Sequence, residues 1–204
     1  ALAVEVDGGA LLQGRAARRL VIGLYAYVVD PDGRVVAHTA EGLVLDPSQY
    51  RDRIVETGLK FVGRFLLDPG SYTLRVMVEN NTTGEYFMSW SVVTVPAAGD
   101  PDPQLLPPLI PDADRSWVLV KQAGGRTAFA VADETEILPA AAPVVIENQP
   151  AEIYLGGGGW DSNARIEIRI LNEIGRLVFE PSAKFSEPPM GDFQFLRTVL
   201  PAID

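Results

Sequence analysis

The stretch Leu66–Trp90, LLDPGSYTLRVMVENNTTGEYFMSW, decides the fold class of this chain. Its first half alternates apolar residues with mostly polar ones, and the apolar positions are Tyr72, Leu74, Val76 and Val78. An alternation with a period of two predicts a strand that has one buried face. The segment Asn80–Gly84 is typical of a turn, and the run after it, up to Val95, is rich in aromatic and β-branched residues. We therefore predict a long β-hairpin that closes a β-sandwich.

Similar strand and turn patterns precede this hairpin. Residues Leu20–Val29 are apolar on both faces, as expected for a strand that is covered on both sides. The turn DPDG at Asp30–Gly33 has Pro and Gly where a type I turn prefers them, so it predicts a hairpin with the next strand. Within Glu41–Gly58 only Tyr50 and Ile54 keep a helical spacing, which predicts one helical turn or a loop.

Composition divides the chain into three parts. Residues 98–115 contain five prolines and four aspartates without a regular period, which predicts an extended linker. Short apolar runs separated by Gly, Pro and Asn follow this segment. We therefore predict a β-sandwich domain at residues 1–97, a linker at 98–115 and a second β-sandwich domain at 116–204.

An internal repeat connects the two predicted domains. The segment YVVDPDGRVV at Tyr27–Val36 aligns without gaps with RILNEIGRLV at Arg169–Val178, so that the turn glycines and the following arginines coincide. In each half a loop and an aromatic strand follow. These features predict an all-β chain of two tandem antiparallel immunoglobulin- or fibronectin-like β-sandwiches.

The second sandwich has no counterpart of the hairpin Gly70–Val95 within these residues, so we expect it to be incomplete. A missing pair of edge strands leaves backbone groups and apolar surface uncovered, which proteins normally avoid. There are three explanations: this chain is a fragment of a longer one, another chain supplies a strand, or the second domain has a smaller topology. We favour the first explanation.

The composition also limits the classes of function. The chain has 204 residues and a formal net charge of -10, which repels phosphate backbones and anionic lipids, so we expect no nucleic-acid partner. Its apolar runs are shorter than the ~20 residues of a membrane helix, so we expect no membrane insertion. The chain has no cysteine and one histidine, His38. A Ser-His-Asp triad would also need a G-x-S-x-G serine, which is absent, so we expect no enzymatic activity.

Four aspartates are candidate calcium ligands, because calcium prefers carboxylate oxygens. They are Asp30 and Asp32 in the DPDG turn, and Asp112 and Asp114 in the linker. For the first two we favour an ordinary hairpin turn, since the D-x-D spacing is only part of a calcium-loop signature. For the last two, solvated charges in an extended segment are the default interpretation. We expect no cofactor, with calcium as the alternative.

The segment LGGGGWDS at Leu155–Ser162 lacks the G-K-[ST] ending and the helix of a phosphate-binding loop. We interpret it as a flexible connection between strands. Trp160 in this segment is a candidate ligand-binding residue, because an exposed tryptophan can stack on a sugar ring. The alternative is that Trp160 covers the core, which is the commoner role of a buried aromatic residue.

Three segments resemble a known family: YAYVVDPDGRVVAHTAEGLVLD, GLKFVGRFLLDPGSYTLRVMVENNTTGEY and LPAAAPVVIENQPAEIYLGGGG. They are similar to the C-terminal region of bacterial von Willebrand factor A-related (VWA-related) proteins. The resemblance implies an exported protein, periplasmic or extracellular, in which a VWA-type domain precedes β-sandwich modules. It also implies that a closing hairpin follows Asp204. The D-x-S-x-S motif of the family's metal-ion adhesion site is absent, because DSNAR at Asp161 departs from it, so that site is not carried over.

The first residues, ALAVEV, are typical of a strand, so we expect a signal peptide to lie outside these residues. The function that we predict is a non-catalytic structural or protein-interaction module of an exported bacterial protein, with recognition through loops and edge strands. The expected partners are other protein domains or chains, including an upstream VWA-type domain. The alternatives are a carbohydrate- or calcium-dependent adhesion module, a hydrolase accessory domain or enzyme, and a subunit that assembles by strand exchange.

Overall fold

A computed structural model describes residues 1–12, 19–97, 102, 104–112, 117–122, 129, 137–143, 149–159, 167–172, 174–180, 184–185, 193–200 and 202. Strands account for 55% of the described residues and helices for 11%, which confirms the all-β class. No helix among these residues is long and apolar enough to cross a membrane. The chain divides into two compact units.

The first unit comprises Ala1–Ala97 and Asp114–Ala128, and the second comprises Ala98–Ala113 and Phe129–Asp204. We expected residues 116–204 to form the second domain, but residues 116–128 belong to the first unit. Here β8 (Val118–Lys121) pairs in parallel with β4 (Leu59–Gly63). A parallel partner can lie far away in the sequence, so local patterns do not reveal the pairing.

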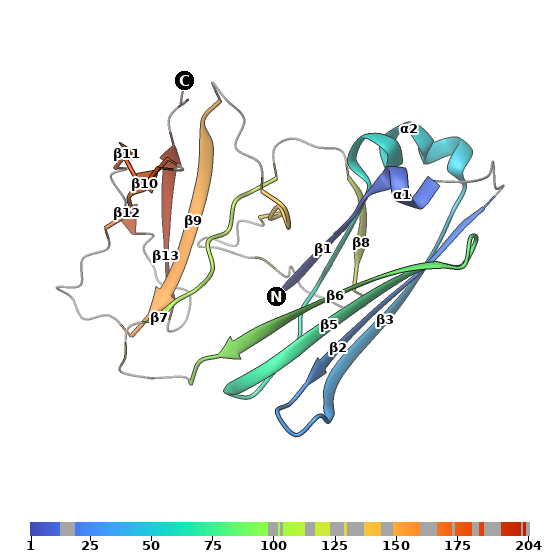
Figure 1. The fold of residues 1–204 in the computed structure, drawn as a ribbon, viewed down its shortest axis with the longest axis horizontal. Helices are drawn as coiled ribbons and strands as arrows, with labels where there is room; N and C mark the ends of the chain where they lie inside the picture. Colours follow the sequence, from blue (N-terminus) through green and yellow to red (C-terminus); the bar gives the residue numbers. More distant parts are fainter. Residues whose placement is uncertain are drawn as a thin grey trace. The chain divides into compact units, whose positions relative to one another are not determined.

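The larger sheet of the first unit has four antiparallel strands in the order β3-β2-β5-β6 (Figure 1). The strands are β2 (Leu20–Val29), β3 (Val35–Leu45), β5 (Gly70–Asn80) and β6 (Glu85–Val95). Both predicted hairpins, β2–β3 and β5–β6, are therefore confirmed. The central strand β2 is buried on its inner face but mostly half-buried on its outer face, so the burial of both faces that its continuous apolar sequence predicted is found only in part.

The smaller sheet of the first unit has the order β1-β4-β8, where β1 is Leu2–Val6. All five residues of β4 are buried. Buried side chains from both sheets and from two helices form one core cluster, whose members are Leu2, Leu11, Leu20, Ile22, Leu24, Ala26, Leu45, Ile54, Leu59, Phe61 and Val78. Burial of this apolar surface is the main force that holds the two sheets together.

The prediction of one helical turn or a loop within Glu41–Gly58 is wrong, because α2 (Pro47–Thr57) is an eleven-residue helix. Its first turn is fixed by Asp46, whose carboxylate accepts hydrogen bonds from Ser48 N (2.9 Å) and Ser48 Oγ (2.7 Å). These hydrogen bonds lower the pKa of Asp46. Gly58 ends the helix with a positive φ of 79°, and its N–H donates to Ile54 O. A second helix, α1 (Gly8–Leu12), follows β1.

The second unit contains a four-stranded antiparallel sheet in the order β12-β13-β9-β7. The strands are β7 (Gln104–Leu105), β9 (Ala151–Gly158), β12 (Lys184–Phe185) and β13 (Phe193–Leu200). Part of the predicted linker, β7, is thus a strand of this sheet. A separate hairpin is formed by β10 (Ile170–Leu171) and β11 (Leu177–Phe179).

The interpretation of the glycine-rich segment as a flexible connection is wrong for Gly156–Gly158, which are the last residues of β9. Gly157 and Gly158 pair with β13 on one side and with β7 on the other. Backbone hydrogen bonds on both edges offset the conformational entropy that glycine loses in a strand.

The internal repeat has the same hydrogen bonds in both copies. In the first hairpin Asp30 N donates to Arg34 O (2.9 Å), and the Asp30 carboxylate accepts from Arg34 N (2.8 Å). In the second, Asn172 N donates to Arg176 O (2.9 Å), and the Asn172 side chain accepts from Arg176 N (2.9 Å). Both turns also contain a glycine with positive φ and follow a register shift in the strand pair. The repeat is therefore structural at this hairpin.

Candidate functional site

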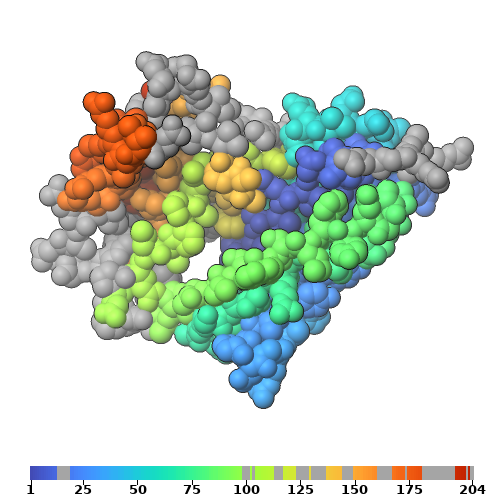
Figure 2. All heavy atoms as spheres, in the orientation of Figure 1, coloured from blue at the N-terminus to red at the C-terminus, as the bar shows by residue number. Residues whose placement is uncertain are grey.

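The most exposed regular element of the first unit is the edge strand β6. It is the last strand in the order of the larger sheet, and β5 is its one strand neighbour among the residues that the structure describes. Ten of its residues are exposed and the last, Val95, is half-buried. Figure 2 shows the green atoms of this region at the molecular surface. The backbone N–H and C=O groups on the outer side of β6 therefore form an open edge.

Six side chains of β6 are large and apolar although they are exposed. Tyr86 is 67% exposed, Met88 72%, Trp90 72% and Val92 63%. These four alternate along the strand, so they lie on one face of the sheet. No charged residue lies between Glu85 and the end of the strand. Scattered exposed apolar residues are normal, but a contiguous row on an open edge marks an interaction surface.

The row of large side chains on β6 continues across the outer face of the sheet, which is the face that points away from the core. The strand register places Trp90 beside Arg75, Arg75 beside Tyr27, and Tyr27 beside His38. The rings of Tyr27 and His38 are stacked, with centroids 6.5 Å apart and an interplanar angle of 21°. The surface that contains β6 therefore joins a cross-strand row of aromatic and cationic side chains.

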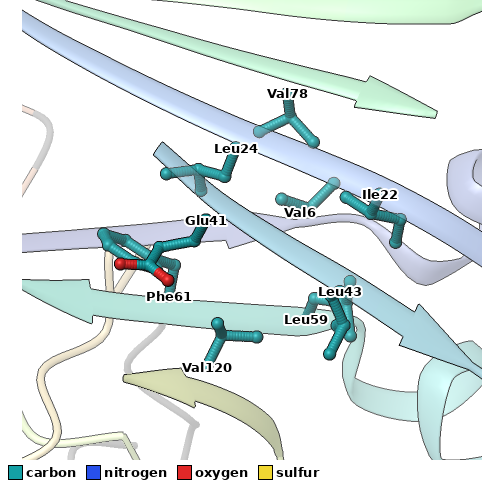
Figure 3. A pocket seen from close by; sticks show the side chains of 9 residues that line it. All are labelled: Val6, Ile22, Leu24, Glu41, Leu43, Leu59, Phe61, Val78 and Val120. Atoms are coloured by element: carbon teal, nitrogen blue, oxygen red, sulfur yellow. The ribbon is translucent and has the colours of Figure 1, made fainter. Parts of the chain in front are cut away.

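The opposite edge strand, β3, has two features that oppose pairing with another strand. The register shift at Val28/Val29 is a bulge near the start of β3. Glu41 faces the interior, where its carboxylate lines a cavity between the two sheets (Figure 3). Bulges and inward-pointing charges both protect an edge against unwanted pairing. The strand β6 has no bulge, since its eleven residues pair with β5 in an unbroken register, and its one charged residue, Glu85, is exposed at the first position of the strand.

The cavity in Figure 3 is not a ligand site. It has a volume of about 20 Å³, and apart from Glu41 its lining is apolar: Val6, Ile22, Leu24, Leu43, Leu59, Phe61, Val78 and Val120. A volume of this size holds about one water molecule. Organic ligands need pockets of roughly 300 Å³ or more.

The aspartates of the DPDG turn are used in the hairpin itself. The Asp30 carboxylate accepts the Arg34 N–H, and Asp32 forms an exposed ion pair with Arg34 at 3.8 Å. Asp112 donates its backbone N–H to Leu138 O (2.8 Å). Asp114 lies outside the described residues. Within the described part of the chain, no three His, Asp or Glu side chains come together in a group that could hold a metal ion.

Trp160, the sequence-based ligand candidate, also lies outside the described residues. The residue that sequence reasoning missed is Trp90, which it placed in a closing hairpin and assigned no surface role. The signal in the sequence was the long charge-free run from Tyr86 to Val95, which is unusual for an edge strand. That β6 is an edge follows only from the strand order.

A buried cation lies on β4 of the first unit. The Lys60 side chain is fully buried, and its Nζ lies 2.8 Å from Glu5 Oε1 and 4.4 Å from the centre of the Trp117 ring. The carboxylate and the ring together compensate the ammonium charge for its loss of water. This arrangement connects β1 and β4, and we assign it a structural role.

A second polar cluster lies on β9 and β13 of the second unit. Glu152 accepts hydrogen bonds from Arg197 and from Tyr154 Oη, the latter at 3.1 Å. The bond from Arg197 is the main cause that lowers the pKa of Glu152, while burial raises the pKa of Tyr154. Both carboxylate oxygens are engaged, so the cluster holds the two strands together rather than offering a free general base.

A scan against protein-family models and a search of the curated proteins found no match to this chain.

Proposed function

We propose that this chain is a non-catalytic protein-interaction module of an exported bacterial protein, and that it recognises partners by adding a strand to β6. The observation that carries the proposal is the exposed, charge-free edge of β6 with its row of apolar side chains. The resemblance of the strand and turn segments to VWA-related proteins supports the export and the bacterial source.

Strand addition fits the chemistry of this edge. A partner in extended conformation pairs with every second backbone N–H and C=O of β6, which supplies affinity that is independent of sequence. Specificity comes from side chains that alternate along the added strand and contact Met88, Trp90 and Val92. A charged partner strand would lose the water around its charges on this surface, so the preferred partner is apolar at alternate positions.

The test is a selection of random peptides on the purified chain. We expect the enriched peptides to alternate apolar and other residues, and to bind with a saturable signal in fluorescence anisotropy. The variant Val92→Lys should weaken this binding by at least about tenfold, because a lysine then lies among the apolar contacts.

The matched control is Val44→Lys on the opposite edge. Val44 is 61% exposed and lies on the same outer face as Val92, which is 63% exposed. We expect peptide binding to be unchanged in this variant. Binding that both variants weaken equally, or that neither variant weakens, would show that β6 is not the recognition edge.

A second candidate function is carbohydrate binding on the outer face. The observation in its favour is the row of Trp90, Arg75, Tyr27 and His38, because aromatic rings stack on sugars and Arg donates to hydroxyl groups. A glycan array distinguishes the two functions. Tyr27→Ala should abolish glycan binding but preserve peptide binding, since Tyr27 lies on the central strand and not at the edge.

A further inference from the structure

We infer that the partner at β6 is a second copy of this chain, which pairs its own β6 antiparallel to the first about a twofold axis at Trp90. The inference rests on the proposed function, because it uses the same edge strand. It adds the identity of the partner and the register of the pairing.

The register follows from the faces of the sheet. Residues directly opposite one another in an antiparallel pair lie on the same face. A twofold axis perpendicular to the sheet keeps the outer face of one copy continuous with that of the other, so Trp90 and the other outer residues must oppose outer residues. The register that pairs all eleven residues places Glu85 opposite Val95 and Trp90 opposite its own copy.

This register produces favourable side-chain pairs. Met88 lies opposite Val92 on the outer face, and Phe87 lies opposite Val93 on the inner face. The two Trp90 side chains meet at the axis, where offset stacking of aromatic rings is favourable. The register of β5 places Arg75 beside each Trp90, so a cation flanks the pair on both sides.

The charges allow self-pairing. Glu85 is the one charged residue of β6, and the pairing places the two copies of Glu85 at opposite ends of the interface. At ~3.4 Å per residue they lie roughly 34 Å apart, several times the ~8 Å screening length at physiological salt. The net charge of -10 on each chain opposes association. Salt also screens the repulsion between charges that lie outside the interface and farther apart than the screening length.

The apolar area also fits a second copy. A large aromatic side chain can bury ~150–250 Å². Scaled by their exposed fractions, the apolar side chains of β6 present roughly 700 Å² over the two faces of the sheet, and pairing of two copies buries the part of this area that lies toward the second β6. These side chains are Tyr86, Phe87, Met88, Trp90, Val92 and Val93. Association of two copies reduces the exposed apolar area of both at once.

Cross-linking tests the register, because the chain has no cysteine of its own. Ser89 lies opposite Ser91 of the second copy in the inferred pairing. A mixture of the Ser89→Cys and Ser91→Cys variants should therefore form several-fold more disulfide-linked dimer on mild oxidation than either variant alone. The Val44→Cys variant measures the background from random collisions.

Light scattering after gel filtration tests the assembly itself. We expect the full chain to have twice its monomer mass at micromolar concentration. Trp90→Lys should raise the dimer Kd by at least about 30-fold, because it places two ammonium groups at the axis. Trp90→Ser is a second, uncharged variant, and circular dichroism checks that both remain folded. Val44→Lys should leave the dimer intact.

A monomer at every concentration, or a dimer that Trp90→Lys leaves intact, overturns the inference. Equal cross-linking of the mixture and the single variants overturns the register. Neither result bears on the proposed function, since a monomer that binds selected peptides and loses them on Val92→Lys still uses β6 for another partner. If the control variant Val44→Lys loses that peptide binding, the proposed function is overturned instead.

Discussion

Replacement of Asn80 by alanine should strongly destabilise the first unit. Asn80 is fully buried at the end of β5, and its Nδ2 donates to Leu11 O at 2.9 Å, in the last turn of α1. Its Oδ1 accepts from Thr82 N at 3.1 Å and so fixes the turn between β5 and β6. One side chain thus joins a helix end, whose carbonyls lack partners within the helix, to the hairpin turn.

The size of the effect follows from these two bonds. The Leu11 carbonyl would be left buried without a partner, which costs about 1–3 kcal/mol. The Thr82 N–H is partly buried and can reach water, so its loss costs about 0.5–1 kcal/mol. We expect a total of about 1.5–4 kcal/mol, a large part of the 5–15 kcal/mol that stabilises a typical domain.

Urea unfolding followed by circular dichroism measures this loss. The midpoint should fall for Asn80→Ala, while the slope of the transition should not change. The control is Asn81→Ala, because Asn81 is the exposed neighbour of the same residue type in the turn. We expect that variant to cost less than about 0.5 kcal/mol. The reasoning would be refuted if the two variants lost equal stability, or if Asn80→Ala cost less than about 1 kcal/mol.

Two further predictions concern the helix contact and the acid response. Gly8→Ala should destabilise the first unit by about 2 kcal/mol or more in thermal melts, since the new Cβ would lie 1.5 Å from Ile54 O. Gly42→Ala, where the new Cβ has open space, should not destabilise it. The Arg197 hydrogen bond lowers the pKa of Glu152 below its usual 4.5, so its contribution to stability is present above that pH and is lost as the pH falls through the lower folded value. Glu152→Gln should therefore flatten the loss of melting temperature between about pH 5 and pH 3; parallel curves for both proteins would contradict this.

Local patterns predicted the elements that neighbouring residues specify. The alternation around Leu74 and Val76 predicted β5, and the turn at Asp30–Gly33 predicted the hairpin β2–β3. The repeat between the two hairpin turns extends to individual hydrogen bonds, because the same turn residues satisfy the same backbone groups. The helix α2 was missed because its apolar face is narrow, and the capping residue Asp46 was the better signal.

The candidate site could be predicted only in part. The sequence of β6 showed an apolar strand, but an apolar strand can be buried or exposed. The aspartates of the DPDG turn and Trp160 were predicted as candidate ligand-binding residues, because carboxylates bind calcium and an indole ring can stack on a sugar. Residue type alone does not show that the Asp30 carboxylate accepts a hydrogen bond from the backbone N–H of Arg34.

By itself the sequence determined the all-β class, the strand hairpins and the turns, since these depend on alternation and on turn residues close together in the chain. The tertiary structure decided which distant strands pair, such as β4 with β8 and β7 with β9. The tertiary structure also decided that β6 is an open edge, whereas the other edge strand, β3, has a bulge and points Glu41 toward the interior. Strand order and burial depend on contacts between residues far apart in the chain, and local sequence does not record those contacts.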